Sequence, residues 1–270
     1  MVRTRIRQAL AALTLAALAG AAPESTPDDG FLSLFNGKDL SQWKVPEGDR
    51  NEWKIVEVDG QGVIDCDVKR APDGDMNLIS NGTYGDFVLK LDWRLKEASF
   101  KNRGIAYILP DGTHARGIDG KDLKLVLPDA DSGVYLRDVK GKSQVNIWCW
   151  PIGSGEVYGY RMDKSMSPEV RAGVTPRHQA DKPVGEWNSF EITLKGDRLT
   201  VVLNGVTVIE HAQLPGIPLT GPICLQHHGS FKGGKYVVTP SLVQFRNIRI
   251  KPLSIPDQLD NSKVQELRKP

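Results

Sequence analysis

The residues best suited to ligand chemistry lie in one run, from Gln144 to Arg161. Successive side chains of a strand point to opposite faces, so the first part of this run has two different sides. One side is apolar and carries Val145, Ile147 and Cys149. The other carries two amides and two indoles, on Gln144, Asn146, Trp148 and Trp150, and Tyr158 and Tyr160 follow. Amides that bond hydroxyl groups, beside rings that can stack on a sugar, predict a carbohydrate-binding face.

Two further segments place polar side chains together by the same alternation. In residues 131–137 the apolar Val134 and Leu136 mark the core side, so Asp131, Tyr135 and Arg137 share the opposite face. In residues 223–228 the same argument puts Gln226 and His228 on one face. The candidate catalytic residues are His228, Glu156, Arg137 and Asp131. The candidate substrate-binding residues are Gln144, Asn146, Trp148, Trp150, Tyr135, Tyr158 and Gln226.

Each candidate also has a structural interpretation. His228 could be a hydrogen-bonded histidine that caps a turn before Gly229. Arg137 could form an ion pair with Asp131 at a strand edge, and Glu156 could be a solvated loop residue. Trp148 and Trp150 could pack beneath a loop as core aromatics.

The segments that position these residues have the sequence pattern of many short strands. Alternating patterns cover 52–58, 62–65, 86–95, 104–109, 132–137, 189–194, 223–228 and 242–251. Asn204-Gly205, between the apolar runs 199–203 and 206–209, predicts a type I′ hairpin. Only short segments such as 167–172 could be helical, and 110–128 is expected to be a surface insertion. This pattern predicts one all-β domain, a jelly-roll β-sandwich of two antiparallel sheets.

The N-terminal residues read as an export signal. Arg3, Arg5 and Arg7 precede an apolar stretch, 9–18, and Ala19-Gly20-Ala21 resembles a cleavage site. The stretch is too short to cross a bilayer, so no membrane span is expected. We therefore expect a signal peptide at 1–21, a flexible segment at 22–30, the domain at 31–253 and a tail at 254–270. The mature protein is expected to be secreted or periplasmic.

Charge gives no support for nucleic-acid binding. Removing the three signal arginines from 35 basic residues leaves one fewer base than the 33 acids, without a basic cluster. The three cysteines, Cys66, Cys149 and Cys224, fit either three buried free thiols or one disulfide and one thiol. No cofactor is expected and no metal ligands are assigned. A calcium ion held by loop acids is the remaining option, from Asp73, Asp75, Asp119, Asp129 and Asp131.

Several motifs in order resemble one protein family. They are 31–43 (FLSLFNGKDLSQW), 84–87 (YGDF), 92–94 (DWR), 131–137 (DSGVYLR), 185–188 (GEWN), 203–205 (LNG), 225–229 (LQHHG) and 245–250 (FRNIRI). Together they resemble the DUF1080 family, also called the 3-keto-disaccharide hydrolase domain. The resemblance implies a concanavalin A-like lectin/glucanase fold, a concave sugar-binding sheet and hydrolysis of glycosides oxidised at C3.

One departure from the family bears on mechanism. Many members carry an acid in the strand after the Ser-Gly-x-Tyr-Leu-Arg motif, where this chain has amides at Gln144 and Asn146. An ordinary glycosidase needs two carboxylates, so that mechanism is disfavoured, and any acidic role passes to Glu156 or Asp131. A 3-keto sugar needs only a base, an enolate stabiliser and a proton source.

These observations leave three hypotheses. The first is an exported protein that hydrolyses 3-keto-glycosides by base-assisted elimination and hydration. The second is a non-catalytic carbohydrate-binding module, which the amide-bearing strand favours. The third, a scaffold that uses the aromatic face for protein contacts, lacks the long apolar patch it would need.

Overall fold

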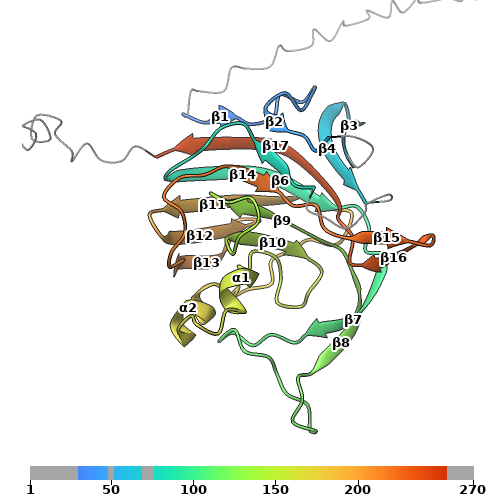
Figure 1. Ribbon diagram of the computed structural model, residues 1–270, viewed down its shortest axis with the longest axis vertical. Coiled ribbons are helices and arrows are strands. Elements are labelled where there is room, and N and C mark those ends of the chain that lie inside the picture. Colours follow the sequence, from blue (N-terminus) through green and yellow to red (C-terminus); the bar gives the residue numbers. More distant parts are fainter. Residues whose placement is uncertain (1–29, 48–51, 69–75, 254–270) are drawn as a thin grey trace, which may run out of the picture. The chain divides into compact units, whose positions relative to one another are not determined.

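The computed structural model describes residues 30–47, 52–68 and 76–253. Two antiparallel sheets make up most of it (Figure 1). The larger sheet has the order β13-β12-β11-β6-β17-β4-β3, with β1 paired to β17, and the smaller has the order β10-β9-β14-β5-β2. The expected all-β sandwich is confirmed. The expected signal peptide, the segment 22–29 and the tail lie outside the described residues.

The strands of the larger sheet are β1 (Leu32–Ser33), β3 (Trp53–Val58), β4 (Gln61–Asp67), β6 (Phe87–Leu95), β11 (Asn188–Lys195), β12 (Arg198–Leu203), β13 (Val206–Gln213) and β17 (Leu242–Pro252). Those of the smaller sheet are β2 (Trp43–Lys44), β5 (Leu78–Ser80), β9 (Asp131–Leu136), β10 (Gln144–Trp148) and β14 (Ile223–Leu225). Two hairpins stand apart, β7 (Phe100–Ala106) with β8 (Lys124–Asp129), and β15 (Ser230–Lys232) with β16 (Lys235–Val238). The helices are α1 (Tyr158–Arg161) and α2 (Pro168–Gly173).

Alternation of apolar residues builds the core between the sheets. Every second residue of β6, from Phe87 to Leu95, is buried. From the smaller sheet the core receives Val134, Leu136, Val145 and Ile147, which are fully buried. The inward face of β9 and β10 is therefore mainly apolar, and Asp131, Gln144 and Asn146 lie on the outer face.

Local signals account for the tightest turns. Asn204 and Gly205 both have positive φ, 52° and 82°, between β12 and β13, which confirms the predicted hairpin. Ser167 caps α2 by accepting a hydrogen bond from the Val170 amide. Neither short helix in the described ranges has the length or apolar character to span a bilayer.

The insertion is only partly a loop. We predicted a surface segment at 110–128, whereas its last five residues belong to β8, which pairs with β7. The remainder folds back on itself through the bridges Ile108↔His114 and Arg116↔Asp122. In Figure 1 this hairpin projects from the sheets beside α1 and α2.

The three cysteines are free thiols. Cys66 and Cys224 are buried and Cys149 is half-buried. Burial raises the pKa of Cys149 and of Cys224 to about 12, so both thiols stay protonated at neutral pH. The alternative with one disulfide is wrong.

Candidate functional site

A pocket opens on the outer face of the smaller sheet. In the pairing of β9 with β10, Asp131 lies opposite Trp148, Gly133 opposite Asn146, and Tyr135 opposite Gln144. Directly opposed residues share a face, so these six positions form one surface. The backbone amide of Gln226 donates to the Gly133 carbonyl at 2.8 Å, which extends this surface beyond β14 to Gln226 and His228.

The pocket has a volume of about 380 Å³, within the range of small-molecule sites. Its lining residues are Asn102, Asp129, Asp131, Gln144, Asn146, Trp148, Trp150, Tyr158, Gln226, His228 and Thr239. Eight of the eleven candidates from the sequence are therefore brought together here. Alternation placed them correctly because all but Tyr158 lie on or next to regular strands.

Amide side chains form the floor of the pocket. The Gln144 amide donates to the side-chain oxygen of Gln226 and, at 3.3 Å, to the Ser132 carbonyl. A Cβ at Gly133 would lie 2.3 Å from Gln144 Nε2, so only glycine leaves room for this contact. Asn146 is 5% exposed, and its side-chain amide makes no hydrogen bond to the described residues. Its amide is therefore available to a ligand, since buried polar groups otherwise find partners.

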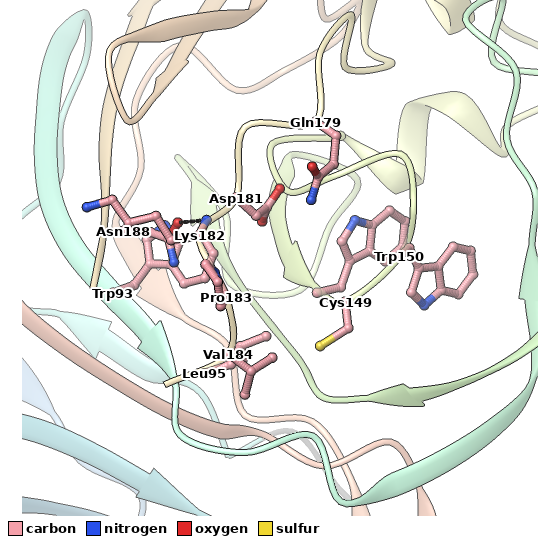
Figure 2. Close-up of a pocket in the computed structure, with 11 residues that line it drawn as sticks. Trp93, Leu95, Cys149, Trp150, Gln179, Asp181, Lys182, Pro183, Val184 and Asn188 are labelled. Carbon is pink, nitrogen blue, oxygen red and sulfur yellow. Dashed lines mark hydrogen bonds between the residues drawn. The ribbon is translucent and has the colours of Figure 1, made fainter. Parts of the chain in front are cut away.

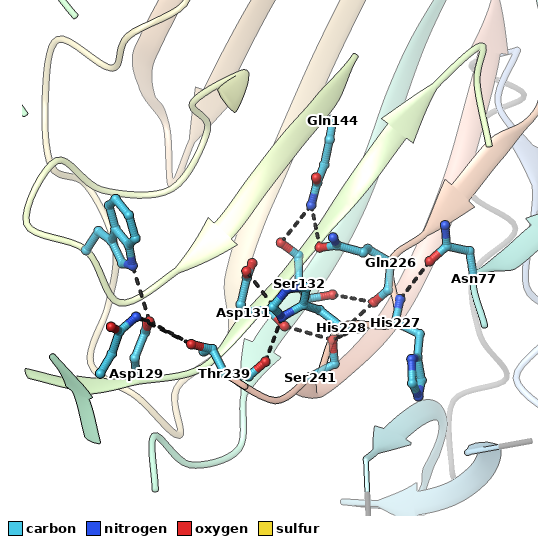
Figure 3. A network of polar contacts seen from close by, with 12 residues as sticks. Asn77, Asp129, Asp131, Ser132, Gln144, Gln226, His227, His228, Thr239 and Ser241 are labelled. Carbon is cyan, nitrogen blue, oxygen red and sulfur yellow. Dashed lines mark hydrogen bonds and ion pairs between the residues drawn. The ribbon is translucent and has the colours of Figure 1, made fainter. Parts of the chain in front are cut away.

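His228 and Asp131 face each other at one end of the pocket (Figure 3). The distance from His228 Nδ1 to the Thr239 carbonyl oxygen is 2.6 Å, and that to Asp131 Oδ2 is 3.5 Å. A carbonyl only accepts, so Nδ1 carries the proton in the neutral ring and Nε2 keeps its lone pair. His228 does make the structural hydrogen bond we considered, through Nδ1, and this bond leaves Nε2 available as a base.

The backbone holds this pair in place. Ser241 Oγ donates to the Asp131 carbonyl and accepts from the His228 amide, both at 2.7 Å. The Ser241 amide in turn donates to the His228 carbonyl at 2.7 Å. One serine therefore ties together the two segments that carry the acid and the imidazole.

Burial changes the acidity of Asp131. Desolvation raises its pKa to about 6, His228 opposes this, and Asp129 adds to it. Its Oδ1 has no hydrogen-bond partner among the described residues. Asp131 therefore titrates close to the pH range in which a histidine does.

Asp129 is a second carboxylate in the pocket that the sequence argument did not select. It is buried, which raises its pKa. Its Oδ2 accepts from Asn102 Nδ2 at 2.7 Å, from Trp150 Nε1 at 3.2 Å and from Thr239 Oγ1 at 3.4 Å. Asn102 and Thr239 were missed as well. The two-residue spacing of Asp129 and Asp131 was a usable signal, but we considered Asp129 only as a loop acid.

The two tryptophans stack on each other. The Trp148 and Trp150 rings lie 4.2 Å apart at 3°. Trp148 is 5% exposed, packs with Ala106 and Ile108, and donates from Nε1 to the Gly153 carbonyl at 2.7 Å. Trp148 is therefore a packed core aromatic, as its structural interpretation predicts. Trp150 is half-buried and Tyr158 is exposed, so these two rings can reach a ligand.

Three candidates lie outside the pocket lining. Glu156 is fully buried and paired with Arg161, so it is neither solvated nor in the pocket. Arg137 follows the end of β9 with φ 57°, which breaks the alternation, and it pairs with Asp86 at 2.7 Å rather than with Asp131. Tyr135 lies beneath the amides, where its hydroxyl accepts from Gln226 at 3.5 Å.

A smaller cavity of about 190 Å³ also borders the indole pair (Figure 2). Cys149 and Trp150 line it together with Asp181 and Asn188. Asn188 Oδ1 accepts from the Lys182 amide at 2.8 Å, and Asp181 Oδ2 accepts from the Ser154 amide at 2.9 Å. These two polar side chains of the cavity therefore accept hydrogen bonds from the backbone of neighbouring loops.

The loop acids are the candidate ligands for a calcium ion. Asp73 and Asp75 lie outside the described residues. Within the described ranges, no group of three or more His, Cys, Asp and Glu side chains is arranged to hold a metal ion.

Comparison with known proteins gives one family and several similar structures. A sequence model of the 3-keto-alpha-glucoside-1,2-lyase-like domain matches residues 30–251. A protein of Parabacteroides distasonis ATCC 8503, provisionally assigned as a glycosyl hydrolase, is 20% identical with a TM-score of 0.50, over 83% of this chain and 95% of that one. This likeness concerns the fold alone.

Two further structures match with lower TM-scores. A second protein of that strain, with the same provisional assignment, is 21% identical over 78% of this chain and 99% of that one, at a TM-score of 0.42. The carbohydrate-binding module CBM66 of Bacillus subtilis is 13% identical over 78% and 95%, at a TM-score of 0.37. No curated protein matches this chain significantly.

Proposed function

Because the chain belongs to the 3-keto-alpha-glucoside-1,2-lyase-like domain family, we propose that it cleaves glycosides oxidised at C3. The reaction is a base-assisted elimination followed by hydration, so its net result is hydrolysis. The outer-face pocket is the proposed site, with the sugar lying between the amide floor and the rings of Trp150 and Tyr158.

The chemistry follows from the ketone. A carbonyl at C3 acidifies the hydrogen on C2, and a base removes it to give an enolate. The enolate expels the oxygen on C1, which restores the ketone and leaves a C1–C2 double bond. The departing oxygen takes up a proton. Water then adds across the double bond, with hydroxyl to C1 and hydrogen to C2. One acid/base group and one enolate stabiliser suffice for this sequence.

His228 is the proposed acid/base. Its Nε2 lone pair accepts the C2 proton, and the resulting imidazolium returns a proton to the departing oxygen. Asp131, 3.5 Å from Nδ1, stabilises the imidazolium while it exists. The unpartnered Asn146 amide is the proposed donor to the enolate oxygen at C3.

The single observation that carries this proposal is the His228–Asp131 pair, fixed by Thr239 and Ser241 in the pocket that also contains Asn146. The test is to incubate the protein with a 3-keto-disaccharide and with its unoxidised parent. Cleavage of the oxidised sugar alone supports elimination. Cleavage of neither, with binding retained, would overturn it.

The alternative is a carbohydrate-binding module without activity. It is favoured by the amides of Gln144 and Asn146, because β10 offers no carboxylate to the pocket. A binding module would hold the oxidised sugar and its parent without converting either one. The same incubation, followed by calorimetric titration of both sugars, separates the two functions.

Export is a further part of the proposal and rests on the sequence of residues 1–21. N-terminal sequencing of the protein recovered from a periplasmic or culture-medium fraction tests it. A chain that begins near Ala22 supports export, and an uncut chain found only in the cytoplasm would contradict it.

A further inference from the structure

A third cavity, of about 780 Å³, lies where the insertion meets the two helices. Its lining residues are Leu109, Thr113, His114, Arg116, Asp122, Met162, Lys164 and Arg171. None of them lines the outer-face pocket, which is called the saccharide pocket below. The volume falls within the range of small-molecule sites, so the cavity can hold a ligand of the size of a sugar ring.

The lining of this cavity is basic. It contains Arg116, Lys164 and Arg171, against one acid, Asp122. Asp122 accepts from His114 Nδ1 at 2.9 Å, and this bond lowers the pKa of its carboxyl. Asp111 lies next to Arg171, accepts two hydrogen bonds from Thr113 and adds a second negative charge, so three basic groups face two acids. Positive charge therefore remains in excess at the cavity wall.

Hydrogen bonds hold the two guanidinium groups before any ligand arrives. Arg171 Nε donates to the Arg161 carbonyl at 2.7 Å, and Arg116 Nη1 donates to the Gly120 carbonyl at 3.0 Å. Each bond uses one donor, so the guanidinium groups keep further N–H groups for a ligand. A guanidinium fork matches the geometry of a carboxylate or sulfate.

The wall itself is anchored to the buried ion pair. A guanidinium cannot accept, so Arg161 Nη1 donates to His114 Nε2 at 3.0 Å and His114 donates from Nδ1 to Asp122. Arg161 is in turn paired with the fully buried Glu156. Its guanidinium also lies 5.5 Å from the ring centroid of Tyr158, which lines the saccharide pocket. A short chain of contacts thus connects the two cavities.

We propose that this cavity, the basic pocket of Arg116, Lys164 and Arg171, binds an oxyanion. The group is a carboxylate or sulfate, carried by an acidic saccharide or present as a free inorganic anion. The proposal does not depend on the elimination chemistry, because it concerns binding at residues outside the saccharide pocket.

The test uses calorimetric titration of the full-length protein at constant ionic strength with sodium sulfate, sodium glucuronate and glucose. We expect saturable binding of the anions that weakens at least about tenfold in Arg171→Gln. Lys164→Gln, a change on the exposed surface, is expected to weaken it several-fold and covers the case in which Arg171→Gln fails to fold. Arg198→Gln removes the same charge beside Asp197, outside the pocket, and should leave binding unchanged.

The outcomes distinguish the sources of the anion. Tighter binding of glucuronate than of sulfate identifies an acidic saccharide, and the reverse order identifies a free inorganic anion. Asp131→Asn should leave either result unchanged, which separates this site from the proposed catalytic one. Absence of anion binding, or equal binding in both pocket variants and the parent, would overturn the proposal.

Discussion

His228 Nδ1 and Asp131 Oδ2 lie 3.5 Å apart, in a pocket whose other side chains are mostly amides and aromatic rings. The Thr239 carbonyl fixes the proton of the neutral imidazole on Nδ1. Asp131 is mostly buried and has few polar partners, so its charge is available to the imidazole. This pair, rather than two opposed carboxylates, is the acid/base unit on which the proposed function depends.

Asp131→Asn is expected to change how stability depends on pH. Burial raises the pKa of Asp131 from an ordinary value near 4 to about 6. The native state therefore binds more protons than the unfolded chain between these values, and this group's contribution to stability falls as pH rises through that window.

Above pH 6 the ionised carboxylate destabilises the fold, and asparagine removes that cost. A quarter of the side chain still reaches solvent, so we expect the variant to be more stable at pH 8 by about 1–2 kcal/mol. Near pH 4 the two proteins should be alike. Unfolding in guanidinium chloride at pH 4 and at pH 8 measures the difference in stability between the variant and its parent. A variant less stable than its parent at pH 8 would contradict the environment assigned to Asp131.

Asn146→Ala is expected to weaken saccharide binding about tenfold with little loss of stability. The Asn146 amide has no partner in the described structure, so its removal breaks no hydrogen bond of the fold. Calorimetric titration with a 3-keto-disaccharide measures the affinity. Asn81→Ala, at an exposed amide outside the pocket, is the control. Equal affinity in both variants would remove Asn146 from the site.

Glu156→Gln is expected to destabilise the protein by about 3–5 kcal/mol. The change leaves the buried Arg161 without its counter-ion, and an unpaired buried charge is costly. The matched control is Glu210→Gln, which breaks an exposed pair with Arg177 and should cost no more than about 1 kcal/mol. Denaturant unfolding of the three proteins compares them, and similar losses would argue against the buried pair.

The sequence predicted the sheets and most of the pocket because both depend on strand alternation. Asp131, Gln144 and Asn146 fall on one face wherever β9 and β10 pair in register. The prediction failed where the strand ended. Arg137 lies one residue beyond β9, and its positive φ turns it towards Asp86.

Strand alternation could not predict where the side chains of loop residues lie. Glu156 lies between glycines and valines in a segment without periodicity, and its burial depends on Arg161 and on the packing of α1. Asp129 was assigned to a loop, although it ends β8 and faces Asn102. Neither contact follows from local sequence, because each joins elements that only the tertiary fold brings together.

In the proposed function, His228 removes the proton from C2 of a 3-keto-glycoside. The most direct test of this role is cleavage of a 3-keto-disaccharide in D2O, with the position of deuterium in the product followed by NMR. A sample without enzyme corrects for spontaneous exchange beside the ketone. We predict that the released 3-keto sugar carries deuterium at C2, and that His228→Gln lowers kcat by about 10²–10⁴-fold with a much smaller change in KM. Cleavage without deuterium at C2, or an unchanged kcat in His228→Gln, would contradict it.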